Sequence, residues 1–521
     1  MSEKILKSTF VIGLMTLVSR ISGLVRDNLF AQFLGSGLVA DVFFVAFRLP
    51  NFFRRLFGEG AFSAAFVPVY SDMAVNRSEL EARQFLALVT GRLICCLLVV
   101  CALGVWGAPW LVSVIAPGFS SDLEKFDLAV SYTRIMFPYL FFISLVALSA
   151  GMLNTKGRFA VAAFTPVILN LCLIAGIWFF VRGTTSETNA VAWSVIAAGI
   201  LQLIFQLPFL AKERCLVRPR VQAKPDEVEA NAASKKVYQL MLPALFGVSI
   251  AQINLLVNTL LASLLVSGSI SWLYYSDRLM EFPVGVFGIA LATAILPKLS
   301  KDHANSSPEA FSLTLDWACR LVVLIAVPAM AALIVLGEAM ITTLYFYGKF
   351  NVADVDSVYR SLVAFSLGIV PIIMIKVLAP GFYAKKNTRT PVRIGVIAMG
   401  VNILFALLLF KPMMHVGLAL STSIAALVNA SLLFILLKKE NTFKVGKGWP
   451  ILVGRVLASA LLMTTLLWWT RGALPSWLDA GAWERIIRLC GLVMLGGGAY
   501  AVSLLVLGAR PHQFSAPQPS T

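Results

Sequence analysis

Several arginines stand inside long apolar runs of this sequence, where a permanent charge is costly. An ionisable side chain at the depth of a bilayer costs about 2.5–3.5 kcal/mol on insertion scales, unless it faces water or a partner. The arginines concerned are Arg20, Arg26, Arg54 and Arg278. Arginine is always charged and donates two parallel hydrogen bonds, a geometry that fits phosphate oxygens. These residues therefore predict a cationic cavity that binds an anionic headgroup such as a phosphate or pyrophosphate.

Carboxylates and further polar groups accompany these arginines and are predicted to line the cavity. They are Asp27, Asp41, Arg48, Asn51, Arg55, Glu59, Asp277 and Glu281. Arg55 with Glu59, and Asp316 with Arg320, have i,i+4 spacing and could instead be structural ion pairs. Such pairing, together with snorkelling to the interface, is the alternative explanation of the charges. It does not explain the four arginines as a set, because the nearby acids are too few to pair with all of them.

Other kinds of site have no support in the sequence. The three histidines are dispersed, and no cysteines form a C-x-x-C pair, so no metal site is predicted. The chain lacks a G-x-x-x-x-G-K-[ST] motif and a G-x-S-x-G motif. We therefore expect no cofactor and no enzyme, but a secondary carrier or a facilitator. Coupling to an ion or to the membrane potential is left open.

Only lipid-embedded helices could position these residues. Hydrophobic residues make up 59% of the 521 residues and charged residues 13%, and the mean hydropathy is +0.84. Because about a quarter of a soluble protein is charged, a soluble enzyme is excluded. Runs of about 20 apolar residues favour spanning helices over a β-barrel. About fourteen spans are predicted, at 8–33, 39–72, 84–107, 127–152, 160–181, 190–211, 237–266, 271–297, 312–336, 356–383, 391–410, 416–437, 450–470 and 484–508.

The net charge of +17 sets the orientation. With a cytoplasmic N-terminus, most Lys and Arg residues fall in cytoplasmic loops, which the positive-inside rule favours. The opposite side carries Lys125, Arg182, Lys349, Lys411, Arg471, Arg485 and Arg488. We therefore expect both termini in the cytoplasm. The basic loops are attributed to topology and anionic lipid headgroups, not to nucleic acid.

Sequence patterns recur about 230 residues apart. The segment 48–71 resembles 278–300, and Asn170 has a counterpart in Asn402. Six spans separate the equivalents, so both copies run in the same direction. We expect an all-α polytopic membrane protein with two six-helix lobes in a parallel pseudo-two-fold repeat, plus two extra C-terminal helices. Its predicted parts are an N-lobe (1–211), a basic cytoplasmic linker (212–236), a C-lobe (237–437), and 438–521 with spans 13 and 14 and a cytoplasmic tail.

Three groups of motifs together resemble one family over nearly the whole chain. They lie at 19–63, including Ala40-Asp41 and Arg48-Leu-Pro50-Asn51, at 271–283, and at 377–383. The chain resembles the MurJ (MviN) family of lipid II flippases, in the multidrug/oligosaccharidyl-lipid/polysaccharide exporter superfamily. The resemblance implies an inner-membrane protein with alternating access. It would carry undecaprenyl-pyrophosphate-linked disaccharide-pentapeptide (lipid II) to the outer leaflet for peptidoglycan synthesis and cell-wall biogenesis.

The resemblance also implies roles for single residues. The pyrophosphate would contact Arg20, Arg26 and Arg278. Asp27 would hold or release the arginines between states, and Asp41 and Glu59 would act in gating or form the bottom of the cavity. Spans 13 and 14 would form a groove for the prenyl tail, and partners among cell-wall synthesis proteins are left open. Some family members bind sodium through aspartates on spans 7 and 11; this chain departs from that pattern, with Gln252, Asn254, Asn258 and Asn402 in those spans.

Three other functions are weaker alternatives. An exporter of a drug or of another polyprenyl-linked saccharide in the same superfamily is the first, although cation exporters favour acidic cavities. An enzyme acting on polyprenyl phosphates would need clustered acids for a metal. The one candidate cluster, Asp226, Glu227 and Glu229, is interpreted as a solvated charge run. A structural scaffold would leave the arginines within the spans unexplained.

Overall fold

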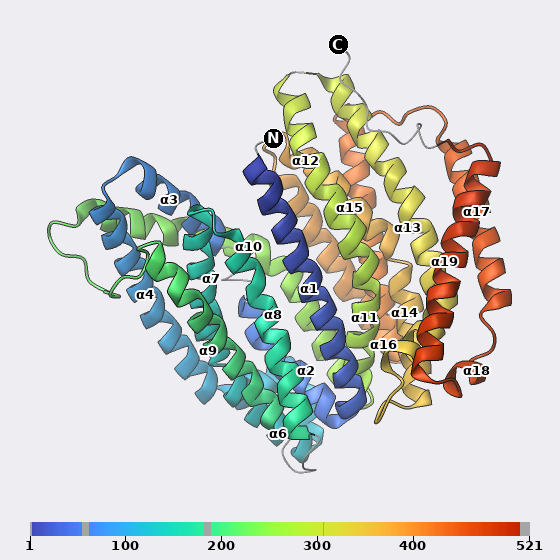
Figure 1. Ribbon diagram of the computed structural model, residues 1–521, viewed down its shortest axis with the longest axis horizontal. Coiled ribbons are helices and arrows are strands. Elements are labelled where there is room, and N and C mark those ends of the chain that lie inside the picture. The colour runs from blue at the N-terminus through green and yellow to red at the C-terminus, as the bar shows by residue number, and fades with distance from the viewer. Residues whose placement is uncertain (1–2, 55–61, 182–188, 306, 511–521) are drawn as a thin grey trace. The chain divides into compact units, whose positions relative to one another are not determined.

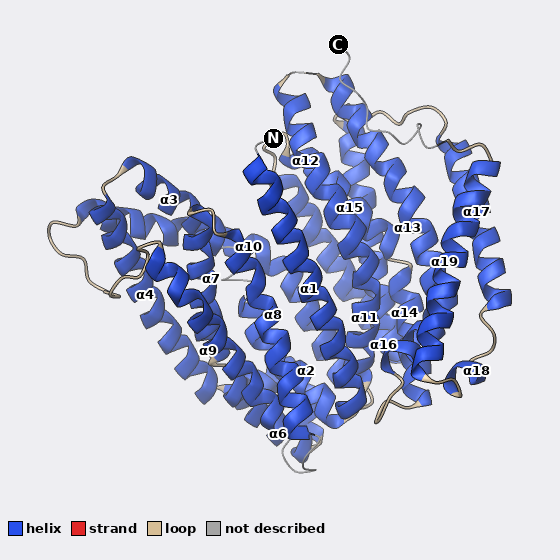
Figure 2. Ribbon diagram, in the orientation of Figure 1, coloured by secondary structure: helices blue, strands red, loops and turns tan. Residues whose placement is uncertain are grey.

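The computed structural model describes residues 3–54, 62–181, 189–305 and 307–510. Every regular element among them is a helix, as Figure 1 traces along the chain and Figure 2 shows by colour. Ten segments of the described chain are long and apolar enough to cross a membrane. The all-helical membrane class predicted from composition is therefore confirmed.

The chain divides into two compact units, of which unit 1 is Met1–Gly268. Its helices are α1 (Glu3–Leu34), α2 (Leu38–Phe53), α3 (Phe62–Asn76), α4 (Glu79–Trp106), α5 (Ala108–Ile115), η2 (Pro117–Ser121), α6 (Leu123–Met136), α7 (Tyr139–Thr155), α8 (Phe159–Gly176), η3 (Ile177–Val181), α9 (Asn189–Lys212) and α10 (Val228–Ser263). Helix α1 packs along α8, α7 and α8 pack along α9, and α3 packs along α10.

Local sequence explains where helices in unit 1 begin and break. Ser78 caps α4: its hydroxyl accepts from the Glu81 amide, and the Glu81 carboxylate accepts from the Ser78 amide, which forms a capping box. Pro138 stands between α6 and α7, where its missing N–H interrupts the helix. The apolar run predicted at 127–152 is therefore one broken span.

The segment between α9 and α10, residues 213–227, lies against α4, and we call it the strap. The Arg220 amide donates to the Ala87 carbonyl over 2.9 Å, and Arg92 donates to the Val221 carbonyl over 3.0 Å. Gly91 allows this contact, because a Cβ there would lie 2.3 Å from the Arg220 carbonyl oxygen. The strap therefore follows the surface of unit 1.

Glu227 closes the strap and is only 2% exposed. Its carboxylate accepts from Arg220 over 2.6 Å and from the Lys224 amide over 3.0 Å. The prediction of a solvated charge run was wrong for this residue, because the strap turns the carboxylate back onto its own chain. Burial alone raises the pKa of Glu227, but the bonds from Lys224 and Arg220 outweigh it and lower the pKa overall.

Unit 2 is Ser269–Thr521. Its helices are α11 (Ser269–Pro283), η4 (Val284–Gly288), α12 (Ile289–Ala304), α13 (Pro308–Tyr345), α14 (Val352–Ser366), α15 (Ile369–Tyr383), α16 (Arg389–Lys439), α17 (Trp449–Thr470), α18 (Pro475–Leu478) and α19 (Ala482–Val506). Helix α16 has non-helical dihedrals at Met414 and joins two predicted spans. Helices α17 and α19 pack on each other and on α13.

Arg485, near the start of α19, is buried. Its guanidinium donates to the carbonyls of Trp477 and Leu478, each over 2.8 Å, and of Phe346 over 3.1 Å. These carbonyls end α18 and α13, so one side chain ties three helices together. Its placement as a loop charge was wrong, because α18 packs against the end of α13 and encloses the guanidinium.

The division into units differs from the predicted lobes by one helix. Helix α10 packs in unit 1, and the division falls between Gly268 and Ser269. The boundaries at 211 and 237 were drawn from the repeat in the sequence, and they stay a prediction.

Candidate functional site

Helices α1 and α8 place Arg26, Asp27 and Asn170 in one buried network. Arg26 and Asp27 are 8% and 4% exposed. The Arg26 guanidinium donates to the Asp27 carboxylate over 2.6 and 2.9 Å, and to Asn170 Oδ1 over 2.9 Å. Asn170 Nδ2 donates to the Ser19 carbonyl and the Ser22 hydroxyl. The charge of Arg26 is thus held by side chains, whose oxygens a ligand phosphate could replace.

Arg20 has a different environment on the same helix. It lies six residues before Arg26 and is exposed. Six residues turn an α-helix by about one and two-thirds turns, so the two side chains leave α1 on different faces. Arg20 can therefore meet a ligand without first giving up a buried partner.

Asp41, in the first turn of α2, is buried in a second polar cluster. Its carboxylate accepts from Lys125 Nζ over 3.2 Å and from the Gly268 amide over 2.7 Å. Lys125 is also buried, donates to the Ser267 hydroxyl over 3.0 Å, and lies 4.4 Å from the Phe119 ring centre. The placement of Lys125 as a loop charge was wrong, because η2 and the first turn of α6 enclose its side chain.

The remaining charges of α2 point to α10 and along their own helix. Arg48 donates to the Leu255 carbonyl over 3.1 Å and to the Thr259 hydroxyl. Arg54 donates from Nε to Asn51 Oδ1 over 2.9 Å. Arg48 therefore fastens α2 to α10 inside unit 1, and Arg54 contacts Asn51 one turn earlier on its own helix.

Helix α11 carries the predicted residues of unit 2. Arg278 forms an ion pair with Glu281 over 3.0 Å, and both side chains are partly exposed. The Arg278 guanidinium lies 5.0 Å from the centre of the Tyr274 ring. Asp277 is partly buried on the same helix. An exposed i,i+3 pair contributes little to stability, so Arg278 can exchange Glu281 for an anionic ligand.

The predicted residues form small groups within each unit. Arg26 with Asp27 and Asn51 with Arg54 lie in unit 1, and Arg278 with Glu281 lies in unit 2. Arg55 and Glu59 fall outside the described residues. A single cavity lined from both units stays a prediction.

Sequence reasoning missed Lys125 and Asn170 as partners of the predicted acids and bases. Lys125 and Asp41 both stand near the membrane face opposite the termini in the predicted topology, so their opposite charges could have suggested a pair. The sequence indicates Asn170 only as the counterpart of Asn402 in the repeat. No local signal joins it to Arg26, which lies 144 residues away.

The Asp316–Arg320 pair is confirmed, at 2.7 Å, and it holds a loop. Asp316 also accepts from the Gly446 amide over 3.0 Å and from Trp449 Nε1 over 2.7 Å. Arg320 donates to the Lys447 carbonyl. The pair therefore fixes the chain where it enters α17, in line with the structural alternative. Within the described ranges, no three His, Cys, Asp or Glu side chains are grouped to hold a metal.

Comparisons with known proteins agree on one family. A family model described as "Lipid II flippase MurJ" matches residues 30–481. A "Probable lipid II flippase MurJ" of Vibrio cholerae is 42% identical, over 98% of this chain and 97% of its own. A "Lipid II flippase MurJ" of Burkholderia cenocepacia is 39% identical, over 96% of both chains.

Solved structures share the fold. "Lipid II flippase MurJ, inward closed conformation" has a TM-score of 0.80 at 26% identity, and covers 95% of this chain and 98% of its own. An inward-facing multidrug resistance MATE family transporter of the MOP superfamily has a TM-score of 0.68 at 13% identity, over 83% of this chain and 98% of its own. The second likeness concerns the fold alone.

Proposed function

The chain belongs to the MurJ family of lipid II flippases, and we propose that it moves lipid II from the inner to the outer leaflet of the cytoplasmic membrane. Relatives of that name match it over nearly their whole length. Because the pyrophosphate of lipid II is charged, the headgroup needs a polar path through the bilayer. The protein acts as a carrier and not as an enzyme, since this transfer makes and breaks no covalent bond.

The proposed architecture has fourteen spans and two repeated lobes, with α17 and α19 as the additional pair. Its support is the recurrence of helix starts at an offset of about 230 residues. Corresponding helices begin at 38 and 269, 79 and 308, 123 and 352, 139 and 369, and 159 and 389. Two lobes of similar plan suit alternating access, in which one lobe rocks against the other around the substrate.

In this proposal the arginines bind the pyrophosphate. The observation that carries it is the burial of Arg26 in a helix of this membrane protein, with Asp27 and Asn170 as exchangeable partners. A pyrophosphate oxygen can replace the Asp27 carboxylate, because both are anionic acceptors for the same guanidinium fork. Arg20, Arg54 and Arg278 would supply further donors.

The other predicted residues would form the gate and the cavity lining. The Asp41–Lys125 pair holds the Gly268 amide at the end of unit 1, so its rearrangement could accompany opening. We propose the same class of role for Arg48, Asn51, Arg55, Glu59, Asp277 and Glu281. The membrane potential supplies about 2.3 kcal/mol per charge per 100 mV, enough to bias the cycle.

We place the protein in the bacterial inner membrane with both termini in the cytoplasm. Ten apolar helical segments support the multi-pass location. The excess of Lys and Arg in alternate loops supports the orientation.

The test replaces Arg26 or Arg278 with Ala in cells that depend on this protein. We expect normal amounts in the membrane, loss of growth, and a fall of about tenfold or more in outer-leaflet lipid II, because a charge-assisted contact to the pyrophosphate is lost. Outer-leaflet lipid II is measured after the wild-type copy is switched off. Arg393→Ala, at an exposed position near the start of α16, is the control.

Stability needs separate treatment, since Arg26→Ala leaves Asp27 buried without its partner. The double variant Arg26→Ala/Asp27→Asn removes both charges and separates lost binding from lost folding. Full growth of Arg26→Ala and Arg278→Ala would reject the pyrophosphate role. Unchanged outer-leaflet lipid II after loss of the protein itself, with another polyprenyl-linked saccharide retained inside, would favour the alternative substrate.

A further inference from the structure

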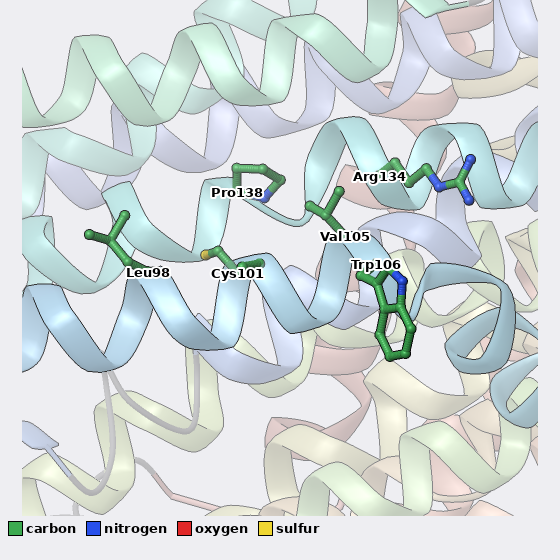
Figure 3. Close-up of a pocket in the computed structure, with 7 residues that line it drawn as sticks. Leu98, Cys101, Val105, Trp106, Arg134 and Pro138 are labelled. Carbon is green, nitrogen blue, oxygen red and sulfur yellow. The ribbon is translucent and has the colours of Figure 1, made fainter.

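An apolar slot opens on unit 1 between α4 and the break that separates α6 from α7 (Figure 3). Its walls are Leu98, Cys101, Ala102 and Val105 of α4 and, across from them, Pro138. Its volume is about 590 Å³, and it is a shallow depression that is largely open to the surface. A slot of this composition suits a hydrocarbon chain.

The slot follows from a close helix contact and a helix break. At Gly104 an added Cβ would lie 2.0 Å from the Phe137 ring. The backbone of α4 therefore lies so close to this ring that only glycine fits. Pro138 directly afterwards interrupts the helix. The slot lies beside that contact, and it is a feature of the surface and not a packing defect in the core.

Arg134 stands at one end of the slot beside Trp106, with Leu98 at the other end (Figure 3). Arg134 is exposed, and no carboxylate of the described chain lies within ion-pair distance of it. Trp106 is 83% exposed, and Trp110 is exposed on the next helix. Exposed tryptophans mark the level of lipid headgroups, where an arginine meets phosphate.

In unit 2, protein covers the face of α13 that corresponds to the slot in the proposed repeat. The residues 230 positions further on are Ala331, Ala332 and Val335, and they pack against α17 and α19 residues such as Leu467. The residues 229 and 230 positions after Trp106, Val335 and Leu336, both lie in this contact, and Leu336 is 1% exposed. The residues at the same offsets from Arg134, Val363 and Ala364, are both apolar. Protein thus covers the apolar face in unit 2, whereas in unit 1 a cation borders an uncovered slot.

We propose that this slot binds an anionic phospholipid, with an acyl chain along α4 and the phosphate on Arg134. A second protein helix would bring apolar surface over Arg134 and leave the guanidinium without a counterion, which is costly. A lipid phosphate supplies the counterion and its acyl chain fills the slot. In the proposed orientation the lipid belongs to the outer leaflet. The inference goes beyond lipid II transport and does not depend on it.

The test measures lipid binding by native mass spectrometry of the purified, delipidated full-length protein. The probes are phosphatidylglycerol and phosphatidylcholine with identical acyl chains. Arg134→Gln should weaken one phosphatidylglycerol site about tenfold, because charge-assisted bonds to the phosphate are lost. Phosphatidylcholine should be weakened less, because its choline cation already neutralises the phosphate. Ala102→Trp should fill the slot and weaken both lipids. Arg393→Gln removes the same charge at an exposed site on α16 and should retain this lipid.

Three outcomes overturn the proposal. Equal loss in Arg134→Gln and Arg393→Gln means that net charge alone attracts the lipid. Loss only in Ala102→Trp means an apolar slot that ignores the headgroup. Unchanged binding with a change in oligomeric state means that another copy of the chain covers the face. If Ala102→Trp fails to fold, as gel filtration and thermal unfolding would show, Ala102→Leu takes its place.

Discussion

In the proposed repeat, helices α4 and α13 correspond to each other, yet their surfaces are covered differently. Each holds a connecting segment in its first half: Arg92 of α4 binds the strap, and Arg320 of α13 binds the segment before α17. The second halves of the two helices differ in what covers them. Helices α17 and α19 pack on α13, whereas Trp106 of α4 stays exposed.

With the proposed lipid in the slot, protein would complete the surface of one unit and lipid that of the other. Transfer from lipid to a protein contact brings no hydrophobic gain, so the α17–α19 pair must be held by packing and polar bonds. Arg485 supplies such bonds at one end and Asp316 at the other. Neither fastening has a counterpart among the described residues of unit 1. Each can be tested by substitution, with stability measured by thermal unfolding of the purified protein.

The largest effect is expected for Arg485→Ala, which would make the covered face of α13 resemble the open face of α4. The substitution leaves buried carbonyls of α13 and α18 without a donor and should cost about 4 kcal/mol. Arg488→Ala is the control, because that half-buried side chain is held mainly by Ser476 and should cost less than about 1 kcal/mol. Equal losses of unfolding free energy in the two variants would show that the hydrogen bonds of Arg485 do not hold α18 and α19 on α13.

Trp106 and Leu336 offer the direct comparison, since the proposed repeat places them within one residue of equivalent positions on α4 and α13. Leu336→Ala should cost about 3 kcal/mol because it leaves a cavity under α17 and α19. Trp106→Ala should change the free energy of unfolding by less than about 0.5 kcal/mol, because no protein covers this side chain. A large loss in Trp106→Ala would mean that protein covers this face of α4 after all.

Asp316→Asn should cost about 2 kcal/mol, because a charged acceptor for Arg320, Gly446 and Trp449 is replaced by a neutral one. The matched control is Asp356→Asn, which breaks an exposed i,i+4 pair with Arg360 and should cost well under about 1 kcal/mol. If both variants behaved alike, the Asp316 cluster would be an ordinary surface pair.

The smallest effect concerns pH and the strap on α4. The lowered pKa of Glu227 means that the carboxylate stabilises the docked strap above the ordinary carboxyl pKa of about 4.3. This contribution is lost as the pH falls through the lower folded value. Between pH 7 and pH 3.5 the melting temperature of the wild type should therefore fall further than that of Glu227→Gln. A larger fall in the variant would reverse the sign of the argument.

The helical membrane class could be predicted from the sequence, because apolar runs and loop charges report directly on a lipid environment. The partners of Lys125, Arg485 and Glu227 could not. Their positions beside apolar runs indicate solvated charges, since a sequence gives position along the chain but not which neighbouring element folds over a side chain. Arg134 stands inside an apolar run, and only the structure shows that it borders a slot.

The docked strap has a mechanical consequence. Although 25 residues were predicted to link the lobes, the strap and α10 belong to unit 1, so the chain passes between the units only at Gly268 and Ser269. Gly268 has a φ of 101°, a conformation that favours glycine, and its amide is bonded to Asp41. In the proposed alternating-access cycle, a rotation of one unit against the other would therefore change the backbone dihedrals at Gly268 and Ser269 and strain the hydrogen bond between Gly268 and Asp41. A long flexible linker would have taken up the same rotation without strain.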